Sequence, residues 1–212
     1  KYSTKINAII NNILTSEGVI FVFSNYITGG ILPLALALEQ NGIQKYGGEG
    51  DQLLVSDTKK KSTKIKYILL TGDNALSPNK QEEINIVTGN HSSINNGDAK
   101  EIKVILGTSV TGEGLDFKKI REIHIMEPWY HLSKLEQIVG RGIRNCSHIS
   151  LPYLKRNVTI YLHTAVNPQI ILDEKKQWPG KWETRDYRIY RLAEDKGKKI
   201  GIITRLLKEN AI

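Results

Sequence analysis

The chain has 212 residues and a formal net charge of +8, with 30 lysines and arginines against 22 aspartates and glutamates. The length allows one α/β domain with an extension, or two small domains, and the charge favours an anionic partner such as nucleic acid over simple solubility. A single cysteine, Cys146, excludes an internal disulfide and fits an intracellular, reducing compartment. No run approaches the ~20 apolar residues of a membrane-spanning helix. The sequence begins at Lys1 without an initiator methionine or a signal-peptide pattern, so we expect it to be a piece of a longer protein.

The first third of the chain alternates predicted helices and strands. Apolar residues at helical spacing predict a helix over residues 5–14, and the continuous apolar run Val19–Phe23 predicts a strand buried on both faces. A helix is predicted over residues 34–40. Residues 44–64 then interrupt the pattern, and we interpret them as a surface insertion. The lysine run 59–61 within it is either a solvated tip, which we favour, or a phosphate contact.

The remainder continues the alternation. Further strands are predicted at residues 66–70, 102–106, 122–126 and 158–163. Helices are predicted from Ser77, as cap, to Ile86, and from a capping box at Ser133 to Arg144. The tail predicts two more helices, Thr184–Glu194 and Lys198–Asn210. The fold class is therefore α/β, a parallel sheet with helices on both faces and a C-terminal helical extension, with domain bounds at 1–170 and 171–212.

The run Gln137-Ile138-Val139-Gly140-Arg141-Gly142-Ile143-Arg144 carries the clearest functional signal. Positions i and i+3 of a helix share a face, so Arg141 and Arg144 can reach one anionic centre together, and Gly140 leaves room for a backbone or a phosphate. The planar guanidinium group binds phosphate oxygens in pairs and stays protonated. An ordinary solvated helix face is the alternative for this run taken alone.

A second run, Gly107-Thr108-Ser109-Val110-Thr111-Gly112-Glu113-Gly114-Leu115-Asp116-Phe117, lies upstream. Strand, glycine-rich turn, second strand and arginine-bearing helix follow one another in that order. The two runs resemble motifs V and VI of superfamily-two helicases and translocases. The resemblance covers roughly residues 5–165 and implies a RecA-like fold for that part of the chain.

The sequence lacks the residues that hold nucleotide phosphates and magnesium in this superfamily. The 212 residues contain no G-x-x-x-x-G-K-[ST] match. The run Ile170–Glu174 resembles an acidic magnesium box, but it follows the arginine motif, and we interpret it as a helix start or loop. Two RecA-like domains enclose ATP in these enzymes, and the resemblance implies that this chain is the second one. It also implies ATP and Mg²⁺ as cofactors, with Mg²⁺ held by the first domain, and no ATPase activity in the isolated chain.

The resemblance assigns three groups of site residues. The catalytic group comprises Arg144, as the arginine finger, with Arg141 and Gln137. The ATP-binding group comprises Gly114, Asp116 and Gly140. The group that contacts the nucleic-acid backbone comprises Ser24, Asn25, Thr71, Gly72, Thr108 and Ser109. Hydroxyl groups and loop amides position a sugar-phosphate backbone without reading bases.

Two positions depart from common helicase patterns. Glu113 stands where many helicases carry arginine or another residue, so it receives no role, and the arginine motif begins with Gln137 where DEAD-box proteins have histidine. The runs 113–117, 124–129 and 140–148 look most similar to helicase-like NTPases of large DNA viruses. That group includes poxvirus nucleoside triphosphatase I, the small subunit of the early transcription factor, and giant-virus homologues.

This resemblance implies an ATP-dependent nucleic-acid helicase or translocase. The alternative is a component of a viral transcription factor that binds promoter DNA and polymerase without unwinding. The implied partners are DNA or RNA, the first RecA-like domain in the same full-length chain and a viral RNA polymerase. The implied location is the host cytoplasm or the virion, with no membrane association.

Other side chains give weaker signals. Trp129 and Tyr130 either stack on a base or pack beneath the arginine helix, and we favour packing. No metal-ligand spacing occurs among the remaining candidates, His124, His148, His163 and Cys146. We therefore expect core or capping histidines and no metal site.

Overall fold

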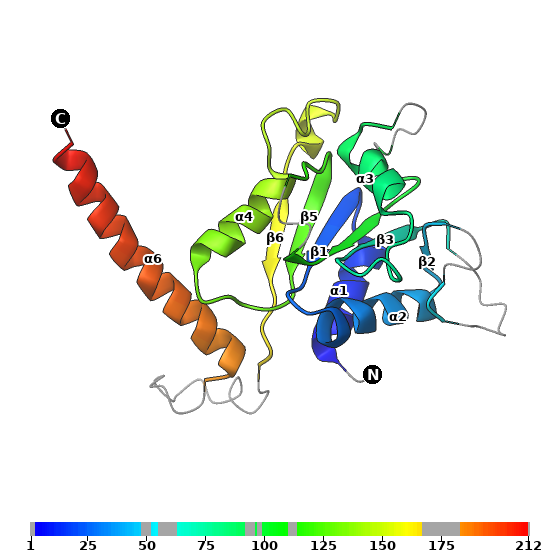
Figure 1. The fold of residues 1–212 in the computed structure, drawn as a ribbon, viewed down its shortest axis with the longest axis horizontal. Helices are drawn as coiled ribbons and strands as arrows, with labels where there is room; N and C mark the ends of the chain where they lie inside the picture. Colours follow the sequence, from blue (N-terminus) through cyan, green and yellow to red (C-terminus); the bar gives the residue numbers. More distant parts are fainter. Residues whose placement is uncertain are drawn as a thin grey trace.

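The computed structural model describes residues 3–47, 52–54, 63–91, 96, 99–109, 114–166 and 183–211. It contains one six-stranded sheet in the order β2-β3-β4-β1-β5-β6, and every pairing is parallel (Figure 1). The strands are β1 (Val19–Phe23), β2 (Gln44–Lys45), β3 (Lys66–Leu70), β4 (Val104–Gly107), β5 (Ile120–Ile125) and β6 (Thr159–Leu162). The predicted parallel sheet is confirmed.

Helices cover both faces of this sheet. They are α1 (Thr4–Thr15), α2 (Leu32–Gln40), α3 (Lys80–Thr88), α4 (Leu132–Gly142) and α6 (Arg185–Glu209). One buried cluster joins α1 and α2 to the sheet, and a second joins α3 and α4 to the other side. A long helix, α6, extends away from the sheet on the side of α4 (Figure 1). The predicted α/β class with a C-terminal helical extension is thus confirmed.

The central strand β1 shows why both faces need a cover. All five of its residues are buried. Because successive side chains of a strand point to opposite faces, Ile20 and Val22 belong to the cluster under α1 and α2, while Phe21 and Phe23 belong to the cluster under α3 and α4. A strand that is apolar at every position is typical of the middle of a parallel sheet.

Several helix boundaries differ from the prediction, and three of them concern α3 and the arginine-bearing helix α4. Ser77 does not cap α3, which begins at Lys80, because the buried Ser77 hydroxyl donates to the Leu69 carbonyl and accepts a hydrogen bond from the Thr71 amide. Helix α4 begins one residue earlier than predicted, after His131, so no capping box forms at Ser133. It also ends at Gly142, which leaves Arg144 outside the helix.

The tail is one helix and not two. Helix α6 runs without a break through Lys196 and Gly197, because Gly197 packs against Leu132 of α4. A Cβ atom at position 197 would lie 2.6 Å from the Leu132 Cδ1 atom. Glycine is there because the two helices approach closely, and it does not end the helix.

The remaining predictions concern the segment 44–64, residues outside the described ranges, the domain division and membrane spans. The segment 44–64, interpreted as an insertion, contributes the short edge strand β2. The lysine run 59–61, the run Ile170–Glu174 and Glu113 lie outside the described residues. The division into domains 1–170 and 171–212 stays a prediction. In the part of the chain that the structure describes, no helix combines the length and the apolar character needed to cross a bilayer.

Candidate functional site

The predicted nucleic-acid residues follow three neighbouring strands at the same end. Ser24 and Asn25 come after β1, Thr71 and Gly72 after β3, and Thr108 and Ser109 after β4. Because these strands are parallel neighbours in the order β3-β4-β1, the three pairs lie together where the strands have their carboxyl ends. We call this end of the sheet, with Met126 and Glu127 after β5, the motif edge.

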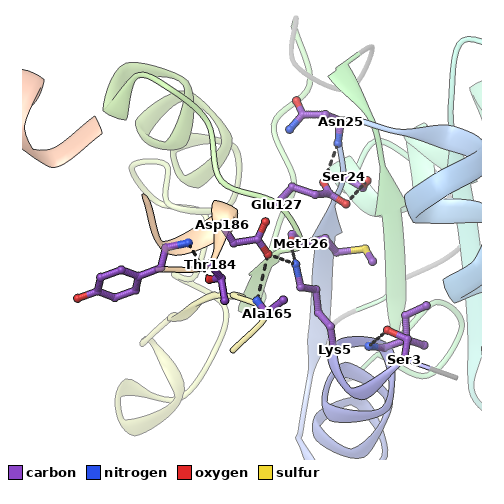
Figure 2. Close-up of polar contacts among 11 residues, drawn as sticks. Ser3, Lys5, Ser24, Asn25, Met126, Glu127, Ala165, Thr184 and Asp186 are labelled. Atoms are coloured by element: carbon purple, nitrogen blue, oxygen red, sulfur yellow. Dashed lines mark hydrogen bonds and ion pairs between the residues drawn. The ribbon is translucent and has the colours of Figure 1, made fainter. Parts of the chain in front are cut away.

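Glu127 organises the loop after β1. Its carboxylate accepts hydrogen bonds from the Ser24 hydroxyl (2.8 Å) and from the Asn25 amide (3.1 Å), as Figure 2 shows. Burial raises the pKa of Glu127, and the two hydrogen bonds oppose that effect. Gly30, just before α2, packs directly against the Ser24 side chain: a Cβ atom at this position would lie 2.0 Å from the Ser24 hydroxyl oxygen. Ser24 is therefore fully buried and holds the loop in place.

Sequence reasoning did not assign a role to Glu127 or Gly30. The position of Glu127 directly after a predicted strand is the signal that could have found it, because carboxyl ends of parallel strands converge on one edge. The same geometry leaves the Asn25 side-chain oxygen buried without a hydrogen-bond partner among the described residues.

The pairs after β3 and β4 divide into a buried and an exposed residue. Thr71 is buried, and its hydroxyl accepts a hydrogen bond from the Asp73 amide (3.2 Å). Gly72 is exposed. Thr108 is 3% exposed and Ser109 is exposed. Buried threonines therefore shape the two turns, while Gly72 and Ser109 present atoms to solvent.

The two predicted nucleotide motifs meet at the end of α4. The Arg144 Nε atom lies 2.9 Å from a carboxylate oxygen of Asp116, and both side chains are nearly half exposed. The amide of Phe117 donates to the carbonyl of Arg141 (3.2 Å). The predicted shared helix face is wrong for Arg144, which follows the helix, but the structure brings Arg144 to the motif V aspartate.

The glycines of these motifs lie in contrasting surroundings. A Cβ atom at Gly140 would find no other atom within 4 Å, and the same holds at Gly114, whose φ is +76°. At Gly142 a Cβ atom would lie 3.0 Å from Ile123 and 3.2 Å from Ile120, both on β5. Gly142 therefore allows α4 to approach the sheet, whereas Gly140 and Gly114 border open space among the described residues.

The remaining residues of the arginine helix are partly accessible. Gln137 is exposed, and Arg141 is half-buried. The Lys134 ammonium lies 3.6 Å from the centre of the Trp129 ring, so Trp129 contacts the first turn of α4. That contact agrees with the favoured packing role for Trp129.

A largely buried ion pair between Lys5 and Asp186 connects the start of α6 to the motif edge. The Lys5 ammonium donates to the Met126 carbonyl (2.9 Å) and to the Asp186 carboxylate (2.7 Å), and Asp186 also accepts from the Ala165 amide (Figure 2). Both charged side chains are about one-fifth exposed. The start of α6 is thus tied, through α1, to the residue before Glu127.

The histidines make hydrogen bonds inside the fold. His124 is fully buried, and its ring bonds to His163 (2.9 Å) and to Glu122 (3.0 Å). Burial lowers the pKa of each of the two histidines to about 4. His148 bonds to the Ile120 carbonyl (2.6 Å) and to the Ser147 hydroxyl. Nowhere in the described ranges do three or more metal-ligating side chains come together.

Comparison with known families gives a match over most of the chain. Residues 4–146 match the family described as helicase conserved C-terminal domain. The matched stretch includes the motif edge and all of α4.

Several viral proteins resemble the chain. A protein of Acanthamoeba polyphaga mimivirus, provisionally named ATP-dependent RNA helicase R563, is 35% identical over 171 residues, which are 80% of this chain and 27% of that protein. The termination factor NPH-I homolog of African swine fever virus is 27% identical and covers 99% of this chain and 32% of its own length. The chain thus spans about a third or less of these relatives.

Among solved structures, the C-terminal part of the Fun30 ATPase domain aligns with 92% of this chain and 52% of its own. The sequence identity is 14% and the TM-score is 0.48.

Proposed function

Because the chain belongs to the helicase C-terminal domain family of superfamily two, we propose that it acts as the second RecA-like domain of an ATP-dependent nucleic-acid helicase or translocase. In this role Arg144 is the arginine finger, Arg141 a second phosphate contact, and Gln137 the link between ATP and nucleic acid. The contact between Arg144 and Asp116, which joins motif VI to motif V, carries the proposal.

The exposure of this ion pair argues for a catalytic use. Exposed ion pairs contribute only about 0–1 kcal/mol to stability, so Arg144 and Asp116 add little to the fold. A guanidinium held by a carboxylate at the surface can exchange that carboxylate for a phosphoryl group of similar geometry. Asp116 therefore orients Arg144 toward the place where the first domain would present ATP.

The open space at Gly140 and Gly114 supports the same placement of ATP. A ligand phosphate or ribose can approach these backbones without meeting a side chain of the described residues. Mg²⁺ would be held by the first domain, since the 212 residues contain no P-loop. The bound ion would neutralise charge that develops on the transferred phosphoryl group.

Nucleic acid is proposed to lie along the motif edge. Ser109, Gly72 and the loop of Asn25 offer hydroxyl, amide and side-chain groups that suit a sugar-phosphate backbone. Ser24, Thr71 and Thr108 support these turns from below, since all three are buried.

The test is Arg144→Ala in the full-length protein. We expect ATP turnover to fall about 10³–10⁵-fold, because an arginine finger contributes that much to the rate. Arg144→Lys should rescue little, since an ammonium group cannot make paired hydrogen bonds. The melting temperature should hardly change, because the ion pair with Asp116 is exposed.

Asp116→Asn is the matched control for loss of the ion pair. If Arg144 served the fold alone, Arg144→Ala and Asp116→Asn would lower the melting temperature equally and leave turnover per folded molecule intact. That result would overturn the proposal.

A viral transcription-factor ATPase is the second candidate. It is favoured by similarity over almost the whole chain to a protein named as a termination factor NPH-I homolog. A strand-displacement assay on the full-length protein separates the two. ATP-dependent displacement supports the helicase, and ATP-dependent promoter binding without displacement supports the transcription factor.

A further inference from the structure

A positively charged surface lies at the end of the sheet opposite the motif edge. It is a hollow of about 880 Å³ at the amino-terminal ends of the strands. Its walls come from residues that precede β1, β3, β4, β5 and β6, and from Arg121, the second residue of β5. Its charged lining consists of Lys64, Lys100, Lys103, Lys119, Arg121 and Lys155, with Glu17 as the one carboxylate. We call this surface the basic hollow.

Three of the cations are fixed by hydrogen bonds inside the protein. Lys103 is 8% exposed, and its ammonium donates to the Ser16 carbonyl (2.6 Å). The Arg121 guanidinium donates twice to Asn157, at 3.1 and 2.7 Å. Lys155 pairs with Glu17 (3.0 Å). These contacts hold positive charge in place around the hollow, so little rotamer entropy remains to be lost on binding.

The location separates the basic hollow from the motif edge. A strand of five residues spans roughly 17 Å, so that distance separates the two edges of the sheet. Gly18 and Lys103 stand before the strands whose other ends carry Ser24 and Thr108. A ligand in the hollow is therefore not the segment that contacts the motif edge directly.

We propose that the basic hollow binds the sugar-phosphate backbone of a nucleic-acid strand, as a second contact site remote from the motif edge. This inference rests on the proposed function in taking nucleic acid as the substrate. It does not depend on the arginine finger.

The lining favours phosphates over other anionic partners. The lining residues of the hollow include no aromatic side chain that could stack on a base, so binding is indifferent to sequence. The cations come from four separate segments of the chain, which suits a polymer with several phosphates better than one small anion. An acidic protein would need apolar anchors at the centre of its interface. Here Leu151 is buried within the fold, and the other apolar lining residues, Ile65 and Ala99, pack against the two core clusters.

The test compares two double variants of the 212-residue chain. Lys64→Ala/Lys100→Ala removes two exposed cations from the hollow, and Lys199→Ala/Lys208→Ala removes two exposed cations from α6. Both lower the net charge equally, and circular dichroism checks the fold. Binding of a fluorescent 20-nucleotide poly-dT strand is followed by anisotropy at several KCl concentrations.

We expect the hollow variant to bind on the order of tenfold more weakly at 50 mM KCl. The slope of log affinity against log salt should fall in magnitude by about 1.4, because each single-strand phosphate contact contributes about 0.7. The α6 variant should keep the wild-type slope. Equal slopes for the wild type and the hollow variant would overturn the inference.

Further experiments distinguish this inference from the proposed function and from binding of an acidic protein. Asn25→Ala/Ser109→Ala alters the motif edge. If it weakens binding while the hollow variant does not, the second site is wrong and the proposed function stands. If the hollow variant weakens binding and Arg144→Ala leaves turnover intact in the full-length protein, the proposed function fails and the second site stands. A 20-residue polyglutamate that binds the hollow as tightly as the oligonucleotide would assign it to an acidic protein and overturn the inference.

Discussion

Gly140 and Gly142 lie two residues apart on α4 but face different surroundings. Gly140 borders open space, whereas a methyl group on Gly142 would press on Ile120 and Ile123 of β5. Alanine favours a helix over glycine by about 1 kcal/mol. Glycine at position 142 is therefore required by the packing of α4 on β5, whereas glycine at position 140 is not required by packing and is explained by the proposed ligand.

We predict that Gly140→Ala raises the melting temperature of the 212-residue chain and lowers ATP turnover of the full-length protein. The added methyl group would occupy the space proposed for ATP. Gly142→Ala should lower the melting temperature instead, because α4 must move away from β5. Thermal unfolding and steady-state turnover measure both effects. A Gly140→Ala protein with full turnover would remove Gly140 from the ATP site.

The histidine cluster makes stability depend on pH. The pKa values of His124 and His163 are lowered to about 4 by burial, while an unfolded histidine titrates near 6.5. Between these values the unfolded chain binds more protons, so stability is present above about pH 6.5 and is lost as pH falls toward 4. Burial also raises the pKa values of Glu122 and Glu127, which acts in the opposite sense, but the large shifts are those of the two histidines, so the histidines decide the sign.

We predict that the free energy of unfolding falls between pH 6.5 and 4, by about 1.4 kcal/mol per pH unit for each proton taken up. His163→Gln should flatten this dependence, because it removes one titrating ring. His131→Gln, at an exposed histidine, is the control and should leave the dependence unchanged. Urea unfolding across this pH range measures it. A stability that rises on acidification would contradict the role assigned to the cluster.

At the scale of elements, α6 is held at its first half only. Ala193 is fully buried and Gly197 contacts Leu132, whereas Ile203 and Leu207 are 57% and 68% exposed. The residues that contact α4 therefore end near the middle of the helix. Two glycines, Gly197 and Gly201, fall on either side of this change.

We predict that Gly201→Ala stabilises the chain by about 0.5–1 kcal/mol, since nothing lies near its Cβ position and alanine favours the helix. Gly197→Ala should gain less, because the methyl group must displace the flexible end of Leu132. Gly197→Leu should be destabilising, since that larger side chain forces α6 away from α4. Urea unfolding of the three variants measures the order, and equal gains at both positions would show that the α4 contact is absent.

The sequence predicted elements well where the pattern itself determines burial. Val19–Phe23 is apolar at every position, and such a run is stable only between two layers of helices. Boundaries failed where a distant residue decides them. Ser77 looked like a helix cap but bonds to Leu69, and Gly197 looked like a break but packs on Leu132.

The site was predictable in part for the same reason. Motif order placed Ser24, Thr71 and Thr108 at one edge, because parallel strands end together. The support given by Glu127 to Ser24 depends on a contact across about a hundred residues, which no local pattern reveals.

At the scale of the whole molecule, we predict that the 212-residue chain alone does not hydrolyse ATP. Its sequence contains no P-loop, so the phosphates and Mg²⁺ lack the groups that hold them. Phosphate release from the pure chain, with and without Mg²⁺ and poly-dT, measures this. Robust Mg²⁺-dependent turnover would contradict the assignment of the chain as a second domain.

The order of strands also has a consequence in time. The central strand β1 pairs with β4 and β5, and Ile20 meets Val104. During synthesis at about 5–20 residues per second, a gap of roughly 85 residues means that β1 waits on the order of 4–17 s for its first partner. Throughout that interval the run Val19–Phe23 is an unpaired apolar strand of the kind that aggregates. We expect α1 and α2, both made early, to cover the Ile20 and Val22 face of β1 during that interval, while the Phe21 and Phe23 face waits for α3 and α4.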